Sequence, residues 1–296
     1  MTGRAHDRFV LRYAAHLGFR SFDMPLFAHA ARSPAPADQI AFAAGIGFAG
    51  IQDPWFSSRP EADRREIAAC LRHHGLAAGS LVIGAKADLA EPLWLPGDRA
   101  GADRLSAAID RAFRDAEALG ATDLAIVPGR APGLPAAEQE ARFVERLHET
   151  GVRAASRGLR VAVEAIAPAT LPNLLLTGFD QAARIVRAAD HPAVRLIYDT
   201  GHQHATDGDL PGRLDREWEI LGPVQIASQP GRCEPGAGTI DIAPLLAQLA
   251  RRGHAGLVEL EHLWLQPGRE AELAGLSWLD AVEPAIRRAM ADGSPQ

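Results

Sequence analysis

Three carboxylates and one amide stand at the ends of four consecutive strand-like runs in the second half of the chain. The runs cover residues 161–164, 196–199, 223–225 and 257–261. An ionised carboxylate at the end of an apolar strand is costly unless a cation, a proton or a polar partner compensates it. The repeated pattern therefore predicts one metal site with ligands from four strands. The predicted ligands are Glu164, Asp199, Gln225 and Glu261.

Each of these residues, taken alone, also has a structural explanation. Asp199 could cap the following helix, since Asp is a preferred N-cap residue. Gln225 could satisfy a buried backbone group, and Glu164 could pair with an arginine. The recurrence of the pattern at four successive strand ends favours a shared site.

The ligand types favour a hard cation. Carboxylate and amide oxygens suit Mg²⁺ or Mn²⁺, whereas Zn²⁺ prefers nitrogen and sulfur. On the last strand, Glu259 and Glu261 are two residues apart and point to the same face. Glu261 lies nearer the strand end and is the predicted ligand, while Glu259 is a deeper partner or an ion-pair acceptor.

Two further residues follow these strands at positions that could contact a substrate. His202 stands three residues after Asp199 and could bind the metal or hydrogen-bond a substrate oxygen. Arg232 lies in a polar loop with Gly and Pro, where its guanidinium could bind a carboxylate or phosphate with two hydrogen bonds. The alternative for Arg232 is a surface ion pair with Glu234. His204 could be a loop residue with no role.

Alternating strand-like and helix-like segments must position these residues. Strands are predicted at 9–17, 48–51, 76–83, 124–127, 160–166, 194–198, 224–228 and 257–260. Helices are predicted at 37–45, 61–74, 103–119, 135–156, 179–189, 210–220, 243–252 and within 270–290. Eight βα units of this kind predict an α/β fold, a single (β/α)8 TIM barrel with its active site at the C-terminal rim of the strands. A doubly wound open sheet is the alternative.

Composition narrows the function. The chain has 296 residues, 47% of them hydrophobic, and a net charge of −6, which argues against a nucleic-acid partner. Its two cysteines form no Cys-x-x-Cys pair and are expected to be free thiols. Neither a signal peptide nor a membrane-spanning stretch is expected, so the sequence predicts a cytoplasmic protein that acts on a small molecule. A homo-oligomer is compatible with the sequence.

Several segments resemble hydroxypyruvate isomerases, a branch of the xylose isomerase-like TIM barrels that also include sugar epimerases. They are residues 163–168, 199–202, 207–210, 225–235 and 256–261, of which 225–235 is the most specific. The resemblance is strong over residues 160–262 and weaker but continuous earlier. It implies one barrel domain over residues 1–296. Many relatives carry histidine where Gln225 stands, and glutamine is similar to the hydroxypyruvate isomerase branch.

The resemblance also implies roles for individual residues. It places one divalent metal on Glu164, Asp199, Gln225 and Glu261, and it makes Glu164 and Glu261 the acid/base pair. His202 and Arg232 are implied to contact the substrate. Gln52 replaces the usual glutamate on the substrate side, the last strand continues as His262-Leu-Trp264, and the third strand ends in Ile83-Gly84 without the expected polar residue.

The reaction implied is a metal-dependent isomerisation of aldose–ketose type through an enediolate, on a small hydroxy-ketone, sugar or sugar acid. The changed residues on the substrate side leave the substrate open. One alternative is a sugar epimerase or a sugar-acid dehydratase on the same metal site. An alternative of another class is a barrel that binds a sugar without converting it.

Overall fold

The computed structural model describes residues 8–89 and 91–293. Nine strands in these residues form one sheet, and every neighbouring pair is parallel. The strands are β1 (Arg12–His16), β2 (Gly50–Gln52), β3 (Ala77–Ala78), β4 (Leu81–Val82), β5 (Asp123–Ile126), β6 (Arg160–Val163), β7 (Val194–Asp199), β8 (Leu221–Gln225) and β9 (Leu257–Leu260).

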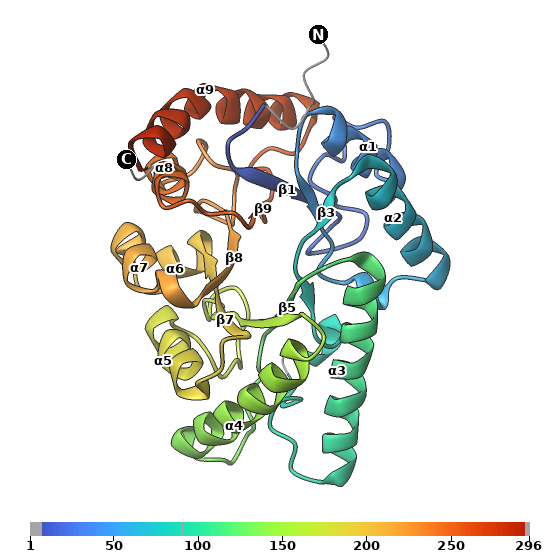
Figure 1. The fold of residues 1–296 in the computed structure, drawn as a ribbon, viewed down its shortest axis with the longest axis vertical. Helices are drawn as coiled ribbons and strands as arrows, with labels where there is room; N and C mark the ends of the chain where they lie inside the picture. The colour runs from blue at the N-terminus through green and yellow to red at the C-terminus, as the bar shows by residue number, and fades with distance from the viewer. Residues whose placement is uncertain (1–7, 90, 294–296) are drawn as a thin grey trace.

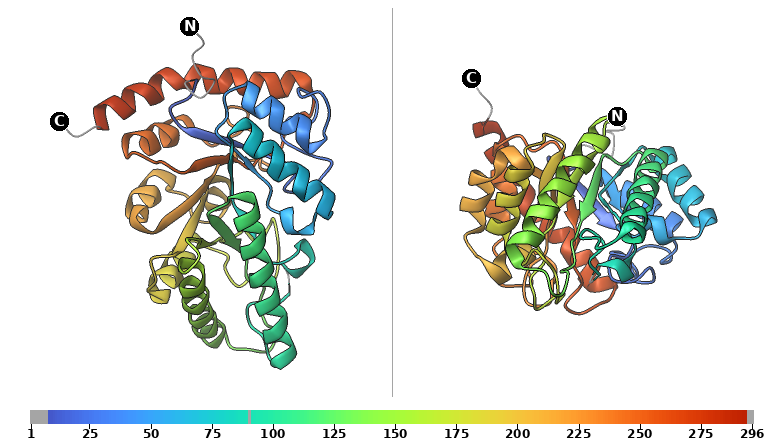
Figure 2. Two further views of the ribbon diagram at one scale, coloured as in Figure 1. Left: turned by 45° about the vertical axis from the view of Figure 1, so that its right-hand side comes forward. Right: turned by 90° about the horizontal axis from the view of Figure 1, so that it is seen from below.

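The α-helices surround this sheet (Figures 1 and 2). They are α1 (Pro36–Gly45), α2 (Glu61–His74), α3 (Arg99–Leu119), α4 (Ala136–Ala155), α5 (Phe179–Ala189), α6 (Thr200–Thr206), α7 (Leu210–Arg216), α8 (Ala243–Arg251) and α9 (Arg269–Gly293). Short 3-10 helices cover Phe56–Ser58, Lys86–Asp88 and Trp218–Ile220. None of the helices in the described part of the chain combines the length and the apolar composition that a bilayer span requires.

The sheet is curled, and its two ends lie next to each other in the chain. The strand order runs β3-β2-β1-β9-β8-β7-β6-β5-β4, and only Gly79 and Ser80 separate β3 from β4. The predicted strand at 76–83 is thus interrupted. A β-carbon at position 79 would lie 2.7 Å from Oε1 of Glu259, so this position requires glycine. The interruption lets the Glu259 carboxylate reach the Ser80 backbone.

Strand β8 differs most from its predicted position at 224–228. It begins at Leu221 and includes Gly222 and Pro223, although proline lacks a donor for the sheet. The pairing with β7 is irregular between Leu196 and Tyr198, and this irregularity accommodates the proline. As a result, Gln225 is the last residue of β8.

Other differences concern helix ends. Helix α3 begins four residues before its predicted start, because the Asp98 side chain accepts a hydrogen bond from Gly101 N at 2.8 Å and caps the helix. The predicted helix at 210–220 is α7 followed by a separate 3-10 turn. Helix α6 was not predicted. Strand β6 ends at Val163, so the predicted strand at 160–166 was too long.

The core is formed between the outer face of the sheet and the apolar faces of the helices. In α4, Phe143 is fully buried and its ring meets Trp94 edge to face, with centroids 5.9 Å apart. Such aromatic pairs contribute about 0.5–1.5 kcal/mol beyond the area they bury. This contact packs α4 against the segment that precedes α3.

Phe143→Ala is expected to lower the free energy of unfolding by about 3–5 kcal/mol, because it leaves a cavity beside Trp94. Urea denaturation would measure the change. The matched control is Val152→Ala in the same helix, where the side chain is 47% exposed and the cost should stay within about 0.5 kcal/mol. Equal costs for the two variants would contradict this account of the core.

Candidate active site

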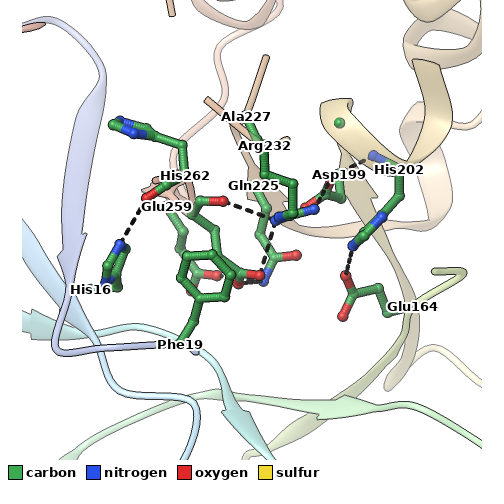
Figure 3. Close-up of polar contacts among 12 residues, drawn as sticks. His16, Phe19, Glu164, Asp199, His202, Gln225, Ala227, Arg232, Glu259 and His262 are labelled. Atoms are coloured by element: carbon green, nitrogen blue, oxygen red, sulfur yellow. Dashed lines mark hydrogen bonds and ion pairs between the residues drawn. The ribbon is translucent and has the colours of Figure 1, made fainter. Parts of the chain in front are cut away.

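The side chains predicted to form the site come together at the carboxyl ends of the strands (Figure 3). Glu164 follows β6, Asp199 and Gln225 end β7 and β8, and Glu261 follows β9. Gln52 ends β2, His202 lies in α6 and Arg232 lies in the loop after β8. All seven are buried.

Asp199 accepts hydrogen bonds from two neighbouring residues. Its Oδ1 accepts a hydrogen bond from His202 N at 2.8 Å, which makes it the N-cap of α6. Its two oxygens also accept hydrogen bonds from Arg232 Nη1 and Nη2 at 3.1 and 2.7 Å. Asp199 therefore caps the following helix, as its position in the sequence suggested. It also belongs to the polar cluster at the strand ends.

Arg232 is directed inward by a tight loop. An isolated bridge joins Ser228 to Cys233, and Gly231 and Arg232 have φ values of 73° and 59°. The Arg232 guanidinium contacts Asp199 and also donates to Oε1 of Glu261 at 3.0 Å. The alternative of a surface ion pair with Glu234 is wrong, because Arg232 is buried and pairs with these two carboxylates.

Glu259 is a deeper partner of the site. Its Oε1 accepts a hydrogen bond from Ser80 N, and its Oε2 accepts one from Ser80 Oγ. Gln52 Nε2 donates to Glu259 and Glu261 at 3.0 and 2.6 Å, and Gln225 Nε2 does so at 3.1 and 2.7 Å. The two amides therefore hold the two carboxylates from opposite sides of β9 in the sheet, Gln52 from β2 and Gln225 from β8. The oxygen of each amide forms no hydrogen bond.

Glu164 faces His202. Nε2 of His202 lies 3.7 Å from Oε1 of Glu164, while Nδ1 accepts a hydrogen bond from Ala167 N at 3.4 Å. Nδ1 thus has no proton, so Nε2 carries the proton of the neutral ring and points it towards Glu164. His204, two residues further along α6, is exposed.

Burial dominates the electrostatics of the cluster. It raises the pKa of Glu164 well above its ordinary value, and repulsion from Glu261 and Asp199 adds to the effect. It raises the pKa of Glu261 to about 7, and it lowers the pKa of His202 to about 4. Burial also acts to raise the pKa of Asp199, but the Arg232 charge, His202 and the hydrogen bonds from both residues together outweigh burial and lower the pKa of that carboxyl. Two glutamates therefore share a pocket in which they do not both ionise readily.

The donor set fits a divalent metal. Ligand atoms of Glu164, Asp199 and His202 lie within 4.8 Å of one another and could hold an ion. Oε1 of Glu164 and Oε1 of Gln225 are buried without a hydrogen-bond partner. Such orphaned oxygens are costly without a cation or a donor. Glu164, Asp199 and Gln225 would thus offer oxygen ligands, and Glu261 lies beside Asp199, with which it shares the Nη2 donor of Arg232.

Sequence patterns did not reveal every residue of the cluster. Ser80 was missed, because a serine inside a predicted strand carries no distinct signal. His16 at the end of β1 was also missed. Its Nε2 lies 3.0 Å from the backbone oxygen of His262, and burial lowers its pKa to about 4. Its position as a polar residue at a strand end, which it shares with Gln52, was the sequence signal that could have identified His16.

These side chains line one cavity of about 310 Å³. Glu164, His202, Gln225, Arg232 and Glu261 contribute to its wall, and Gln52 and Ser80 do so from the neighbouring strands. Of the residues expected on the substrate side, Gln52, His202 and Arg232 line this cavity, whereas Ile83, Gly84, His262 and Trp264 do not.

Comparison with known proteins gives consistent results. A family model described as xylose isomerase-like TIM barrel matches residues 11–282. A putative hydroxypyruvate isomerase of Streptomyces coelicolor is 32% identical over 265 residues, which cover 84% of this chain and 92% of that protein. A 2-oxo-tetronate isomerase of Haemophilus influenzae is 28% identical over 246 residues, with coverages of 81% and 91%. The crystal structure of an AP endonuclease, family 2, from Brucella melitensis superposes with a TM-score of 0.77 at 24% identity, covers 92% of this chain and 98% of its own, and supports the fold alone.

Proposed function

The chain belongs to the xylose isomerase-like TIM barrel family, and from this premise we propose that it is a divalent-metal-dependent isomerase. Its substrate would be a small hydroxy-ketone, sugar or sugar acid. The observation that carries the proposal is the pair of buried glutamates, Glu164 and Glu261, on one cavity. The relatives named as hydroxypyruvate and 2-oxo-tetronate isomerases support it.

The architecture fits this proposal. We interpret β3 and β4 as halves of one strand, which would make the curled sheet a closed (β/α)8 barrel, one domain over residues 1–296. The cavity then lies at the C-terminal rim, where barrel enzymes carry their active sites. A small-molecule substrate, a cytoplasmic location and the absence of nucleic-acid and membrane partners stay predictions from the sequence.

The reaction moves one proton between neighbouring carbons. One glutamate removes the C–H proton next to the carbonyl, and the other side of the pocket returns a proton to the former carbonyl carbon. The hydroxyl proton passes to the former carbonyl oxygen, so substrate and product have the same composition. We assign Glu164 as the base and Glu261 as its partner, because raised pKa values suit groups that exchange protons near neutral pH.

The neighbouring residues prepare these glutamates. Neutral His202 would donate its Nε2 proton to a substrate oxygen beside Glu164, and Arg232 would orient Asp199 and Glu261. Glu164, Asp199, Gln225 and Glu261 would hold Mg²⁺ or Mn²⁺. When bound, the metal supplies a Lewis acid that polarises the substrate carbonyl.

The pKa shifts give a prediction for the metal-free protein. Burial raises the pKa of Glu259 from 4.5 to about 7, so between these values the folded state binds a proton that the unfolded state has lost. The contribution of this group to stability is therefore present below pH 4.5 and is lost as the pH rises through 7. Buried histidines such as His262, with a pKa lowered from 6.5 to about 3 by burial, change stability in the opposite direction between these two values.

Comparison with Glu259→Gln separates the two effects, because the variant keeps the histidines. In EDTA, the stability of the wild type relative to Glu259→Gln should fall from pH 5 to pH 8, as measured by urea denaturation at each pH. The variant Glu138→Gln alters a surface ion pair with Arg142 and should show no such trend. A difference that is constant or rises with pH would refute the assigned shift.

Solvent exchange tests the proposed function. The purified protein, loaded with Mg²⁺ or Mn²⁺, would be incubated in ²H₂O with hydroxypyruvate, short ketoses and sugar acids. We expect deuterium at the carbon next to the carbonyl and an isomerised product, both dependent on the metal. Binding without exchange would indicate a non-catalytic sugar-binding barrel, and loss of water would indicate a dehydratase.

A further inference from the structure

The cavity has two halves of different chemistry. One half carries the charged and amide groups described above, which come from the ends of β2, β6, β8 and β9, from α6 and from the loop after β8. The other half comes from β4, β5 and the segments that follow β2, β4, β5 and β6. Its lining side chains are apolar: Trp55, Val82, Leu89, Val127, Ile166 and Leu171.

This apolar half is separate from the main core. Trp55 and Val82 belong to one small apolar cluster, and Val127 and Ile166 belong to another. Leu89 packs against both clusters and joins them. Side chains inside a barrel normally fill it by packing on one another. Here the two clusters instead form a continuous wall of the open cavity.

Two buried polar side chains adjoin this wall, Ser80 before β4 and Glu164 after β6, and both belong to the polar cluster. Further polar groups lie at the solvent-exposed edge. Thr170, beside Leu171, is exposed, and so is Lys86, whose ammonium donates to the backbone oxygen of Arg20. The wall below them offers Val82, Ala125 and Val127, whose side chains have no hydrogen-bonding groups. A sugar carries a hydroxyl on nearly every carbon, and hydroxyls placed against such a wall would lose hydrogen bonds to water without replacement.

The volume of the cavity also favours a substrate that carries an apolar group. A volume of about 310 Å³ is at the lower end of the range of about 300–1,000 Å³ for pockets that enclose drug-sized ligands. A three-carbon substrate held by Glu164 and Glu261 would leave the apolar half to water. A substrate with an apolar tail would fill both halves.

We infer that the substrate is a 3-hydroxy-2-oxo acid or related hydroxy-ketone with an aliphatic or aromatic tail, which packs against Trp55, Leu89 and Val127. The inference rests on the proposed function for the polar head of the substrate. The tail plays no part in the proton transfer and determines which substrate is selected. Each buried methylene favours binding by about 0.8 kcal/mol, or about fourfold.

Three substrates with the same head test the inference. They are 3-hydroxy-2-oxopropanoate without a tail, 3,4-dihydroxy-2-oxobutanoate with a polar tail and 3-hydroxy-2-oxo-4-phenylbutanoate with an apolar tail. We expect kcat/KM for the phenyl compound to exceed that for the polar-tailed compound at least about 30-fold. Equal values, or a preference for the polar tail, would overturn the inference and leave the proposed function standing.

A variant in the apolar half of the cavity tests where the tail of the substrate binds. Val127→Asn places an amide in the apolar half and should lower the ratio of the two kcat/KM values at least about 10-fold. Val152→Asn makes the same change on the exposed face of α4 and should leave the ratio unchanged. An unchanged ratio in Val127→Asn would contradict the placement of the tail.

A binding measurement separates failure of the inference from failure of the proposed function. Calorimetry would compare 2-oxo-4-phenylbutanoate with 2-oxobutanoate, which both lack the 3-hydroxyl and cannot isomerise. We expect the phenyl compound to bind at least about 30-fold more tightly. Tight binding without turnover of any hydroxy acid would support the apolar subsite and refute the isomerase. Equal affinity of the two compounds would refute the subsite.

Discussion

Glu164→Gln is expected to lower the rate of solvent-deuterium exchange into the substrate by about 10²–10⁴-fold, the usual contribution of a general base. The amide cannot accept the proton, but its oxygen can still serve as a metal ligand. The fold should persist, because Glu164 forms no hydrogen bond through Oε1 and contacts His202 only at 3.7 Å. Mass spectrometry of the recovered substrate would measure exchange, and elemental analysis would measure bound metal.

The matched control for this variant is Glu138→Gln. Glu138 lies on the surface of α4 in an ion pair with Arg142 and does not line the cavity, so exchange should be unchanged. Exchange at the wild-type rate in Glu164→Gln would show that another group is the base. Loss of exchange together with loss of metal would assign Glu164 to the metal alone, and Glu261→Gln would then be tested in the same way.

Arg232→Ala is expected to destabilise the protein about as strongly as Phe143→Ala. It leaves Asp199 and Glu261 buried without their shared cation, and removing one partner of a buried ion pair costs about 3–5 kcal/mol. In the metal-free protein, urea denaturation at pH 8 should report this loss. A divalent metal should recover part of it, since a cation compensates the same carboxylates.

Arg142→Ala provides the comparison for this result. It removes an arginine from a surface ion pair and should cost within about 0.5 kcal/mol. A small cost in Arg232→Ala, similar to that of Arg142→Ala, would mean that the buried carboxylates are protonated or paired in another way. Such a result would contradict the charge arrangement described for the site.

Local sequence patterns predicted much of the fold. Helices α2 and α5 have their predicted bounds, because each combines a clear amphipathic period with a well-defined end, such as Gly75 after α2. The parallel strands followed from the alternation of strand and helix. The family resemblance is confirmed by the match over residues 11–282.

Features that depend on distant contacts could not be predicted. The interruption at Gly79 exists because Glu259, 180 positions later in the chain, lies against it. Strand β8 contains Pro223 only because its pairing with β7 is irregular there. Both features need the partner strand to be known, so the local sequence indicated one uninterrupted strand at 76–83 and a strand at 224–228 that started too late.

The candidate site was likewise predicted in part from local patterns and in part depends on distant contacts. Strand ends placed Glu164, Asp199 and Gln225 at one edge of the sheet, because parallel strands share a direction. The inward turn of Arg232 depends on the Ser228–Cys233 bridge and on the backbone conformation of Gly231, which sequence spacing does not encode. The metal ligands and the catalytic pair stay predictions from the sequence.

Titration with Mn²⁺ tests the central claim most directly, that the last four strands hold one hard cation. Electron paramagnetic resonance would count free and bound Mn²⁺ for the wild type and for alanine variants of Glu164, Asp199, Gln225 and Glu261. The account predicts one ion bound per chain, with binding weakened at least about 10-fold in every variant whose fold is retained by circular dichroism. Absence of binding in the wild type, or unchanged affinity in these folded variants, would contradict it.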